Sequence, residues 1–194
     1  MVEEFMRKPL SFAALIAALA LGLVGCKGGS ASGGATSEAA GAVPAMTESY
    51  PAKNGLVTVH YPASFAAETV GTSSIVLARN LSGGLDEALT FIPIETPIAR
   101  ELHEFAQLMD ADEVKGLTSY VETSSLPATC AGKPGLETTG TWRATRGALT
   151  YLRKACHFLH NGHGYSIAYS VPSTRAAEEE PTLRAIREAT QFNR

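Results

Sequence analysis

Two alternating segments on either side of Asn161-Gly162 constrain the fold more than any other part of the sequence. Residues 148–160 (ALTYLRKACHFLH) and 163–171 (HGYSIAYSV) alternate apolar and polar side chains. An Asn-Gly pair between two such segments is typical of a type I′ turn, whose twist matches that of the flanking strands. The sequence therefore predicts a long β-hairpin, and with it an antiparallel sheet.

A two-residue turn gives this hairpin one apolar and one polar face. It places His160 opposite His163, and the apolar pairs that follow are Phe158 with Tyr165, Cys156 with Ile167, and Leu152 with Val171. The other face carries Arg153, His157, Ser166 and Ser170. Lys154, opposite Tyr169, is the one residue that does not suit the apolar face. This pattern predicts a sheet that is buried on one side.

Shorter strands and two helices are predicted around the hairpin. Strands are expected at 56–61, 74–78, 87–94, 117–122 and 136–143. A helix is indicated by the spacing of Ile98, Leu102, Phe105 and Met109, with Thr96 as its N-cap and Pro97 in its first turn. A final helix is expected to begin near Pro181, to follow the acidic run 178–180, and to bury Leu183, Ile186, Ala189 and Thr190.

The N-terminus has the pattern of an export signal. Residues 10–24 are apolar and uncharged, follow a basic pair, and are too few to span a bilayer, which takes roughly 20 residues. The segment ends in Leu-Val-Gly-Cys, which resembles the bacterial lipobox and implies a signal peptide of residues 1–25, cleavage after Gly25, and diacylglyceryl transfer to Cys26 followed by acylation of the new amino terminus. The alternative is an ordinary secretory signal. Glu3 and Glu4 are unusual in the basic first part of a signal peptide, and both precede Met6. Translation can therefore begin at Met1 or, without these acids, at Met6.

A tether is expected between the anchor and one folded domain. Residues 26–46 comprise Cys26 and a linker composed mostly of Gly, Ser, Ala and Thr, which buries too little apolar surface to fold. Residues 47–194 have a length suited to one domain. Lys27, where an Asp would imply retention in the inner membrane, implies the outer membrane facing the periplasm, with the cell surface as the alternative.

Three further segments together resemble the PsbP-like family. They are the opening GLVTVHYP (Gly55–Pro62), the strand GYSIAY (Gly164–Tyr169) and a closing helix that leads to Phe192. The resemblance covers roughly residues 50–194 and implies an α+β sandwich, in which helices flank an antiparallel β-sheet. The family includes an extrinsic photosystem subunit and bacterial lipoproteins of the DcrB type, and most of its members are accessory, assembly or binding proteins. The resemblance assigns no site residue.

Two cysteines remain once Cys26 is set aside. Because thiols outside the inner membrane are in an oxidising compartment, an even number of them favours a disulfide between Cys130 and Cys156. Cys156 is predicted in mid-strand and Cys130 in a loop that can reach it. Two buried free thiols are the alternative.

Motifs for catalysis or metal binding are weak. His157, His160 and His163 are evenly spaced, but on a hairpin only His160 and His163 share a face, so they are weak metal candidates and a solvated hairpin tip is favoured. The acids Asp110, Asp112 and Glu113 lack EF-hand spacing and are interpreted as a solvated helix end. No nucleophile motif or phosphate-binding loop is present, and no cofactor is predicted.

The sequence thus favours a non-enzymatic, lipid-anchored binding or assembly module of the bacterial envelope. Its partners are expected to be the membrane, through Cys26, and an envelope protein. Nucleic acid is excluded as a partner, because the net charge is −3 and the chain has no overall basic field. Two alternatives stay open: a metal-binding lipoprotein that uses His160 and His163, and a hydrolase whose site is assembled across the fold, with a pocket that holds Ser or Asp beside His.

Overall fold

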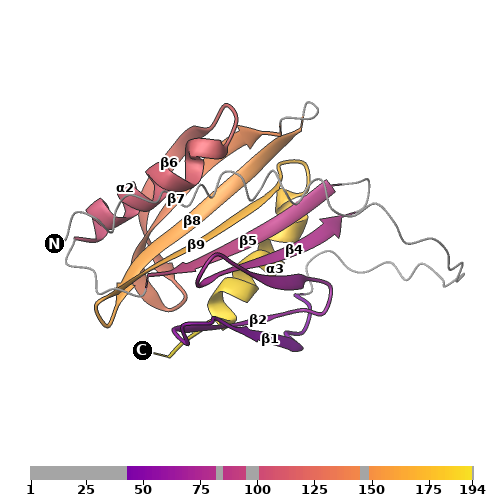
Figure 1. The fold of residues 1–194 in the computed structure, drawn as a ribbon. Helices are drawn as coiled ribbons and strands as arrows, with labels where there is room; N and C mark the ends of the chain where they lie inside the picture. Colours follow the sequence, from indigo (N-terminus) through magenta and orange to yellow (C-terminus); the bar gives the residue numbers. More distant parts are fainter. Residues whose placement is uncertain (1–42, 82–84, 95–100, 145–148, 194) are drawn as a thin grey trace, which may run out of the picture.

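The computed structural model describes residues 43–81, 85–94, 101–144 and 149–193, and these form an α+β fold (Figure 1). The signal peptide, Cys26 and nearly all of the linker lie outside the described residues. So do Thr96, Pro97 and Ile98. Within the described part, no helix is long and apolar enough to cross a bilayer. The predicted fold class, an antiparallel sheet with flanking helices, is confirmed.

A seven-stranded antiparallel sheet forms the centre of the fold. In spatial order its strands are β3 (Ala66–Val70), β4 (Ser74–Leu81), β5 (Leu85–Pro93), β9 (His163–Pro172), β8 (Thr150–His160), β7 (Lys133–Arg143) and β6 (Val121–Cys130). A smaller sheet contains β1 (Glu48–Pro51), β2 (Val57–Tyr61) and β10 (Gln191–Phe192). The helices are α2 (Leu102–Glu113), which continues into the 3₁₀ turn η2 (Val114–Gly116), and α3 (Ala176–Ala189).

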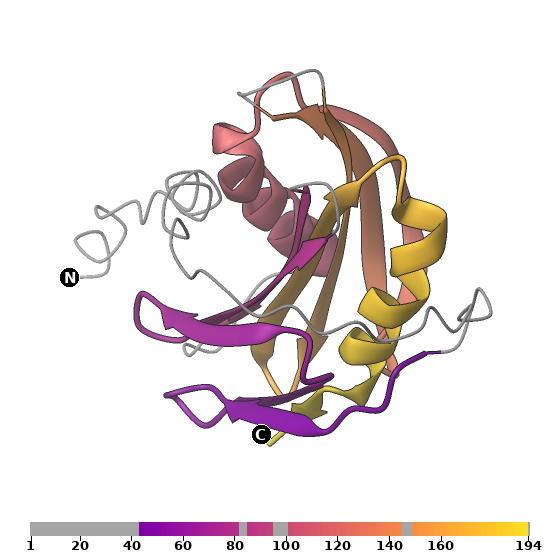
Figure 2. The ribbon, with the colours of Figure 1, turned by 90° about the vertical axis from the view of Figure 1, so that its right-hand side faces the viewer.

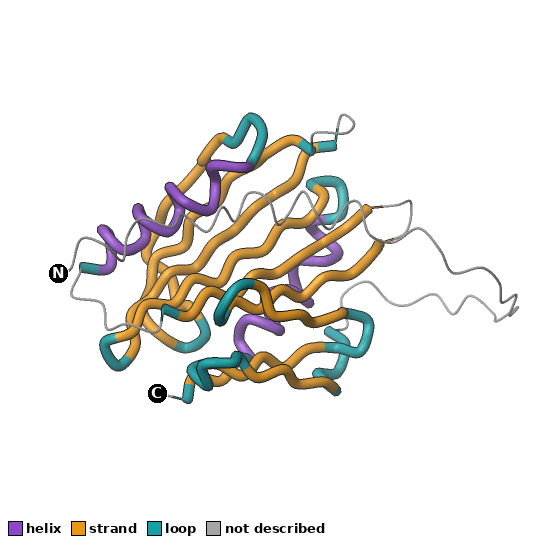
Figure 3. The backbone as a smooth tube through the Cα atoms, in the orientation of Figure 1, coloured by secondary structure: helices purple, strands orange, loops and turns teal. Residues whose placement is uncertain are grey.

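The two helices cover opposite faces of the large sheet. Helix α2 packs on β7, β8 and β9, whereas α3 packs on β9 and on β2 of the small sheet. Figure 2 shows the sheet between them. Figure 3 shows that α2 and the small sheet lie at opposite ends of the described body. The described chain enters the fold at β1, so α2 lies at the end of the body away from that entry.

The predicted hairpin register is confirmed. His160 pairs with His163, and Phe158 pairs with Tyr165, as the two-residue turn requires. Asn161 and Gly162 both have positive φ, the backbone conformation of a type I′ turn.

Lys154, which did not suit the apolar face, has an acidic partner on α3. Its Nζ pairs with the Glu180 carboxylate, to which the Tyr169 hydroxyl also donates, at 3.1 Å. The lysine therefore places its stem at the margin of the core and its charge on an ion pair.

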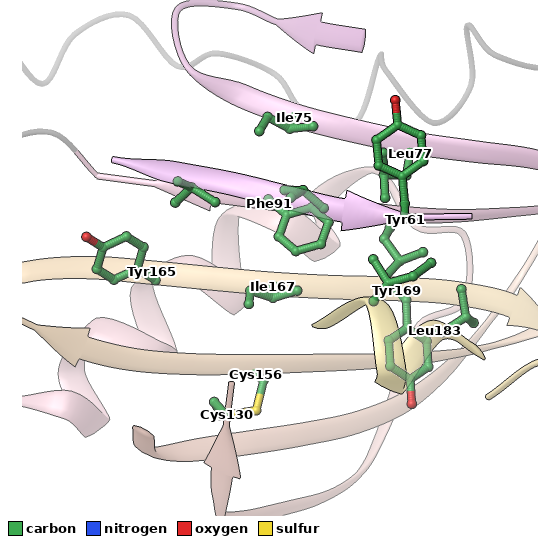
Figure 4. Close-up of a cluster of buried hydrophobic side chains, with 14 of the residues drawn as sticks. Tyr61, Ile75, Leu77, Phe91, Cys130, Cys156, Tyr165, Ile167, Tyr169 and Leu183 are labelled. Atoms are coloured by element: carbon green, nitrogen blue, oxygen red, sulfur yellow. A yellow bond between two sulfur atoms is a disulfide. The ribbon is translucent and has the colours of Figure 1, made fainter. Parts of the chain in front are cut away.

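The hydrophobic core lies between the α3 side of the sheet, α3 itself and the small sheet. It includes Leu183 and Ile186, as predicted for the last helix, and aromatic side chains from β2, β5, β8 and β9 (Figure 4). The Cys130–Cys156 disulfide lies in this core and spans β7 to join β6 to β8. Thr190 is buried as well, but it follows α3 rather than belonging to it.

Strand β6 corrects the expectation for residues 117–130. The predicted strand at 117–122 begins only at Val121, and it continues to Cys130, which ends a strand rather than lying in a loop. The segment is polar and contains Pro127, features that count against a central strand. An edge strand tolerates both. Cys130 pairs with Lys133 across a two-residue turn, and alternation from that pair directs the ring nitrogen of Pro127 away from β7, where no hydrogen bond is lost.

Helix α3 begins earlier than predicted. Its first residue is Ala176, so Pro181 lies inside the helix rather than near its start. Ion pairs stabilise the added turn: Arg175 bonds Glu178 and Glu179, and Glu179 also pairs with Arg79 on β4. The acidic run thus lies in the first turns, where the helix dipole favours it, and fastens α3 to the sheet.

Candidate functional site

A cavity of about 340 Å³ opens between α2 and the outer strands β6 and β7. We call it the α2 cleft. Side chains from α2, η2, the segment before β6, and both strands line it: His103, Ala106, Gln107, Asp110, Ala111, Val114, Tyr120, Glu122, Ser125, Leu136 and Thr138. Its volume lies at the small end of the range for ligand sites, about 300–1,000 Å³.

A buried ion-pair network lies between α2 and the sheet, next to the cleft. Arg153 on β8 has a side chain that is only 3% exposed and pairs with Asp110 and Glu113 on α2. Burial opposes the charge, but the two carboxylates outweigh it and raise the pKa of Arg153, which therefore stays protonated. Ser166 on β9 completes the Glu113 site by donating to its other oxygen at 2.6 Å.

Asp110 joins this network to the cleft. Its Oδ1 accepts hydrogen bonds from Arg153 at 3.1 Å and Thr138 at 3.2 Å, and His157 Nε2 lies 3.1 Å away. Burial raises the pKa of Asp110, but contacts with His157, Arg153 and Thr138 outweigh it and hold the pKa below its ordinary value. Asp110 is therefore ionised at neutral pH. In the described structure, its Oδ2 has no hydrogen-bond or ion-pair partner.

Tyr120 forms another part of the cleft wall. Its ring lies under Arg153, whose guanidinium carbon is 5.8 Å from the ring centre, and its phenol packs across Gly140 on β7. A Cβ at Gly140 would come within 2.5 Å of the ring, so the close approach requires glycine there. The Tyr120 hydroxyl is buried and, within the described residues, makes no hydrogen bond. Burial raises its pKa, so the phenol is neutral at pH 7.

The interpretation of Asp110 and Glu113 as a solvated helix end is wrong. Both carboxylates pair with Arg153, and only Asp112 behaves as expected, forming an exposed pair with Lys115 at 2.9 Å. The network joins residues some 40 positions apart, and sequence analysis has no local signal for such pairing. The alternation of Arg153 and His157 placed both residues on the polar face of the hairpin, but it gave no signal that a helix would cover that face.

The hydrolase alternative predicts a pocket in which Ser or Asp lies beside His, and the cleft has part of this arrangement. Asp110 lines the cleft and contacts His157, but His157 is fully buried and does not line it. Nor does any hydroxyl in the described part of the chain hydrogen-bond to His157, because Ser166 donates to Glu113. Among the described residues, the pair therefore has no hydroxyl nucleophile within hydrogen-bond distance of His157.

The weak metal candidates lie at the hairpin tip, away from the cleft. His163 Nδ1 lies 3.2 Å from the Ile94 carbonyl oxygen, and the His160 ring contacts Phe192 edge-on. Across the described ranges, no three His, Cys, Asp or Glu side chains are grouped so as to hold a metal ion.

The disulfide fixes the strands that form the outer wall of the cleft. Cys130 and Cys156 are both fully buried, and their bond passes over Gly135 of β7. A Cβ at Gly135 would lie 2.5 Å from Cys130 Sγ and 2.6 Å from the His157 carbonyl oxygen. The bond therefore requires glycine at this position and holds the edge hairpin β6–β7 against β8.

Comparison with known proteins relates this chain to others by fold. No protein-family model and no curated protein sequence matches it. Among solved structures, CyanoP, the cyanobacterial PsbP of Synechocystis sp. PCC 6803, matches with a TM-score of 0.51 at 11% identity, over 80% of this chain and 98% of CyanoP. The Ran-binding protein Mog1p of Saccharomyces cerevisiae matches with a TM-score of 0.50 at 15% identity, over 75% of this chain and 94% of Mog1p.

A third similar structure is PA94 from Pseudomonas aeruginosa, a protein of unknown function. It matches with a TM-score of 0.51 at 8% identity, over 76% of this chain and 96% of PA94. Identities this low carry the fold alone. The folded part of this chain thus has the α+β fold that PsbP-like proteins share with Mog1p.

Proposed function

We propose that this chain is a lipid-anchored binding module of the bacterial envelope and that it engages a partner protein through the α2 cleft. The observation that carries the proposal is the cleft itself: a concave site at the sheet edge, next to a network of buried charges. A buried ion pair usually stabilises a fold no more than apolar side chains of similar volume would. Stability alone therefore does not explain this network, and its position beside a cavity suits the recognition of a partner.

The position of the cleft supports this role. The chain enters the fold at β1, and α2 lies at the far end of the body (Figure 1). A domain held to a membrane by residues 26–46 would therefore be attached at the end of the body that lacks the cleft, and the cleft would be clear of the attachment point. The fold supports the proposal by analogy, since Mog1p, which shares it, is a Ran-binding protein.

The anchor is part of the proposal and has its own test. Mass spectrometry of the mature polypeptide is expected to find the first 25 residues removed and acyl chains on Cys26. Two or more acyl chains make a stable anchor where one is marginal. Protease treatment of intact cells should leave an outer-membrane protein that faces the periplasm uncut, whereas a surface-exposed protein would be degraded. An unmodified Cys26 would contradict the anchor.

Photo-crosslinking in living cells tests the cleft as the binding surface. A photoreactive phenylalanine analogue replaces Gln107 on α2 or Ser125 on β6, two exposed residues that line the cleft. Thr72, in the exposed turn between β3 and β4, serves as the control position. Both cleft positions are expected to give the same discrete adduct, and Thr72 none.

The same experiment with Cys26→Ser tests whether the membrane brings the partners together. The adduct is expected to weaken strongly when the anchor is lost, because tethering raises the effective concentration of the domain near an envelope partner. No adduct from either cleft position, or equal adducts from Thr72, would overturn the proposal that the cleft binds a partner.

A further inference from the structure

We propose that the α2 cleft receives a lysine or arginine side chain from the partner protein, with Asp110 as its principal anion. The inference rests on the proposed function and specifies the chemical group of the partner that the cleft binds, a cationic side chain. Its grounds are the oxygen of Asp110 to which no described residue hydrogen-bonds and the surplus of negative charge around the cavity.

Among the described residues, Asp110 accepts its hydrogen bonds through one carboxylate oxygen, Oδ1, and not through the other, Oδ2. Arg153 and Thr138 donate to Oδ1, and His157 contacts the same oxygen. Oδ2 has no such partner among the described residues, although the side chain is only 14% exposed and lines the cavity. Oδ2 is not among the buried polar atoms that lack a partner, so it is open to the cavity and to its solvent. A cation in the cleft would supply a donor to this oxygen through a charge-assisted hydrogen bond.

The charges around the cavity do not balance. Arg153 is one cation, and it faces two carboxylates, Asp110 and Glu113. Glu122, exposed on β6, adds another negative charge at the cavity wall. The cavity lining contains His103 but neither lysine nor arginine. The local field therefore favours a positive guest.

The partner is a protein by the proposed function, and strand β6 limits how it can dock. The exposed apolar side chains of β6, Val121 and Leu126, alternate with the cleft-lining residues Glu122 and Ser125, so they lie on the opposite face of the sheet and do not surround the cleft. The outward-facing Pro127 interrupts the β6 edge, so the partner is expected to dock by its side chains rather than by adding a strand.

Peptide titration of the full-length protein tests this chemistry directly. ¹⁵N-labelled protein, purified from envelopes in detergent micelles, is titrated with acetyl-Gly-Gly-Xaa-Gly-Gly-amide, where Xaa is Lys, Arg, norleucine or Glu. The Lys and Arg peptides are expected to shift the amide signals of the cleft residues in a saturable way, and the norleucine and Glu peptides are not. Added salt should weaken the binding. Spermidine is titrated as the small-amine alternative.

Two variants locate the charge, each with a matched control. Asp110→Asn is expected to weaken Lys-peptide binding about tenfold, and Glu122→Gln about threefold, because Glu122 is exposed and screened. Asp112→Asn and Glu104→Gln make the same chemical changes at exposed positions of α2 outside the cleft lining and should leave binding unchanged. Glu122→Gln keeps the test decisive if Asp110→Asn disturbs the network.

The outcomes separate this inference from the proposed function. If the photo-crosslinked adduct forms and is undiminished in Asp110→Asn and Glu122→Gln, the partner does not bind the cleft through a cationic side chain. This inference then fails, while the proposed function stands. Equal shifts from the norleucine peptide would overturn it as well. Spermidine binding at least tenfold tighter than the Lys peptide would assign the cleft to a small amine instead. If no adduct forms at all, the proposed function fails first.

Discussion

The two faces of the large sheet are built by alternate residues of the same strands, yet the centre of one face is mainly apolar and the centre of the other contains buried charges. On the α3 side, β8 and β9 contribute Phe158, Tyr165 and Ile167 to an apolar core. On the α2 side, the neighbouring positions are Arg153 and His157, which meet carboxylates. Apolar burial stabilises a fold at about 25 cal/mol per Å², whereas a buried ion pair contributes little net stability. We infer that the α3 side supplies most of the stability and that the α2 side is specialised for recognition.

The largest expected effect is on the polar side. Arg153→Met leaves Asp110 and Glu113 buried without their cation, and we expect it to cost about 4 kcal/mol of unfolding free energy. Urea denaturation followed by the fluorescence of Trp142, the only tryptophan, measures this. Adding Asp110→Asn and Glu113→Gln removes the stranded charges and should recover most of the loss. A triple variant as unstable as Arg153→Met would show that the network itself stabilises the fold.

A slightly smaller loss is expected on the apolar side. Leu183→Ala on α3 removes a fully buried side chain from the core and should cost about 3.5 kcal/mol in the same assay. Ser166→Ala, on the polar face of β9, is its counterpart and should cost about 1 kcal/mol, since Arg153 still pairs with Glu113. Equal losses in the two variants would contradict the assignment of stability to the α3 side.

The disulfide should rank next. Replacing both Cys130 and Cys156 with alanine releases a loop of 26 residues, and we expect a loss of about 3 kcal/mol. Reductant should lower the urea midpoint of the wild-type protein and leave that of the double variant unchanged. A reductant effect that persists in the double variant would place the sensitivity elsewhere in the chain.

A smaller, pH-dependent effect distinguishes the buried acids of the two sides. Burial raises the pKa of Glu87 to about 7, despite its pair with Arg79, whereas the donors around Asp110 lower its pKa. Because folded Glu87 binds a proton more tightly than unfolded Glu87, stability should fall by about 2 kcal/mol as pH rises from 4.5 to 7.

Asp110 has the opposite sign. Its contribution is complete above its unfolded pKa and is lost on acidification below that value. Urea midpoints at pH 5 and pH 8 should therefore differ less in Glu87→Gln than in the wild type, while Glu68→Gln, at an exposed position of β3, should keep the wild-type difference. An unchanged difference in Glu87→Gln would show that another group titrates.

The sequence predicted the local parts of this fold well. Asn161-Gly162 sets the register of the longest hairpin, and each apolar pair follows from it by alternation. Segments with weak or conflicting local signals were harder to place. Pro127 and its polar neighbours counted against a strand, so the edge strand β6 was predicted too short. Pro181 suggested a later start for α3, whose first turn is stabilised by ion pairs to Arg175 and Arg79.

The candidate site could not be predicted, because it depends on contacts between distant segments. Asp110 and Glu113 have the spacing of many exposed helical acids, and only the packing of α2 on β8 turns them into partners of Arg153. The cleft arises from the same packing and has no motif. The hairpin pattern predicted a sheet buried on one side only, and this was wrong, because α2 also buries Arg153, His157 and Ser166 on the polar face.

The bond between Cys130 and Cys156 has a consequence for when this protein matures. Cytosolic thiols stay reduced, so a copy of the chain that has not been exported would lack the covalent bond between β6 and β8. Its edge hairpin β6–β7 could then detach from β8 by local unfolding. That hairpin forms one wall of the α2 cleft. For an exported chain, oxidation would complete the docking surface only after translocation, and premature encounters inside the cell would be disfavoured.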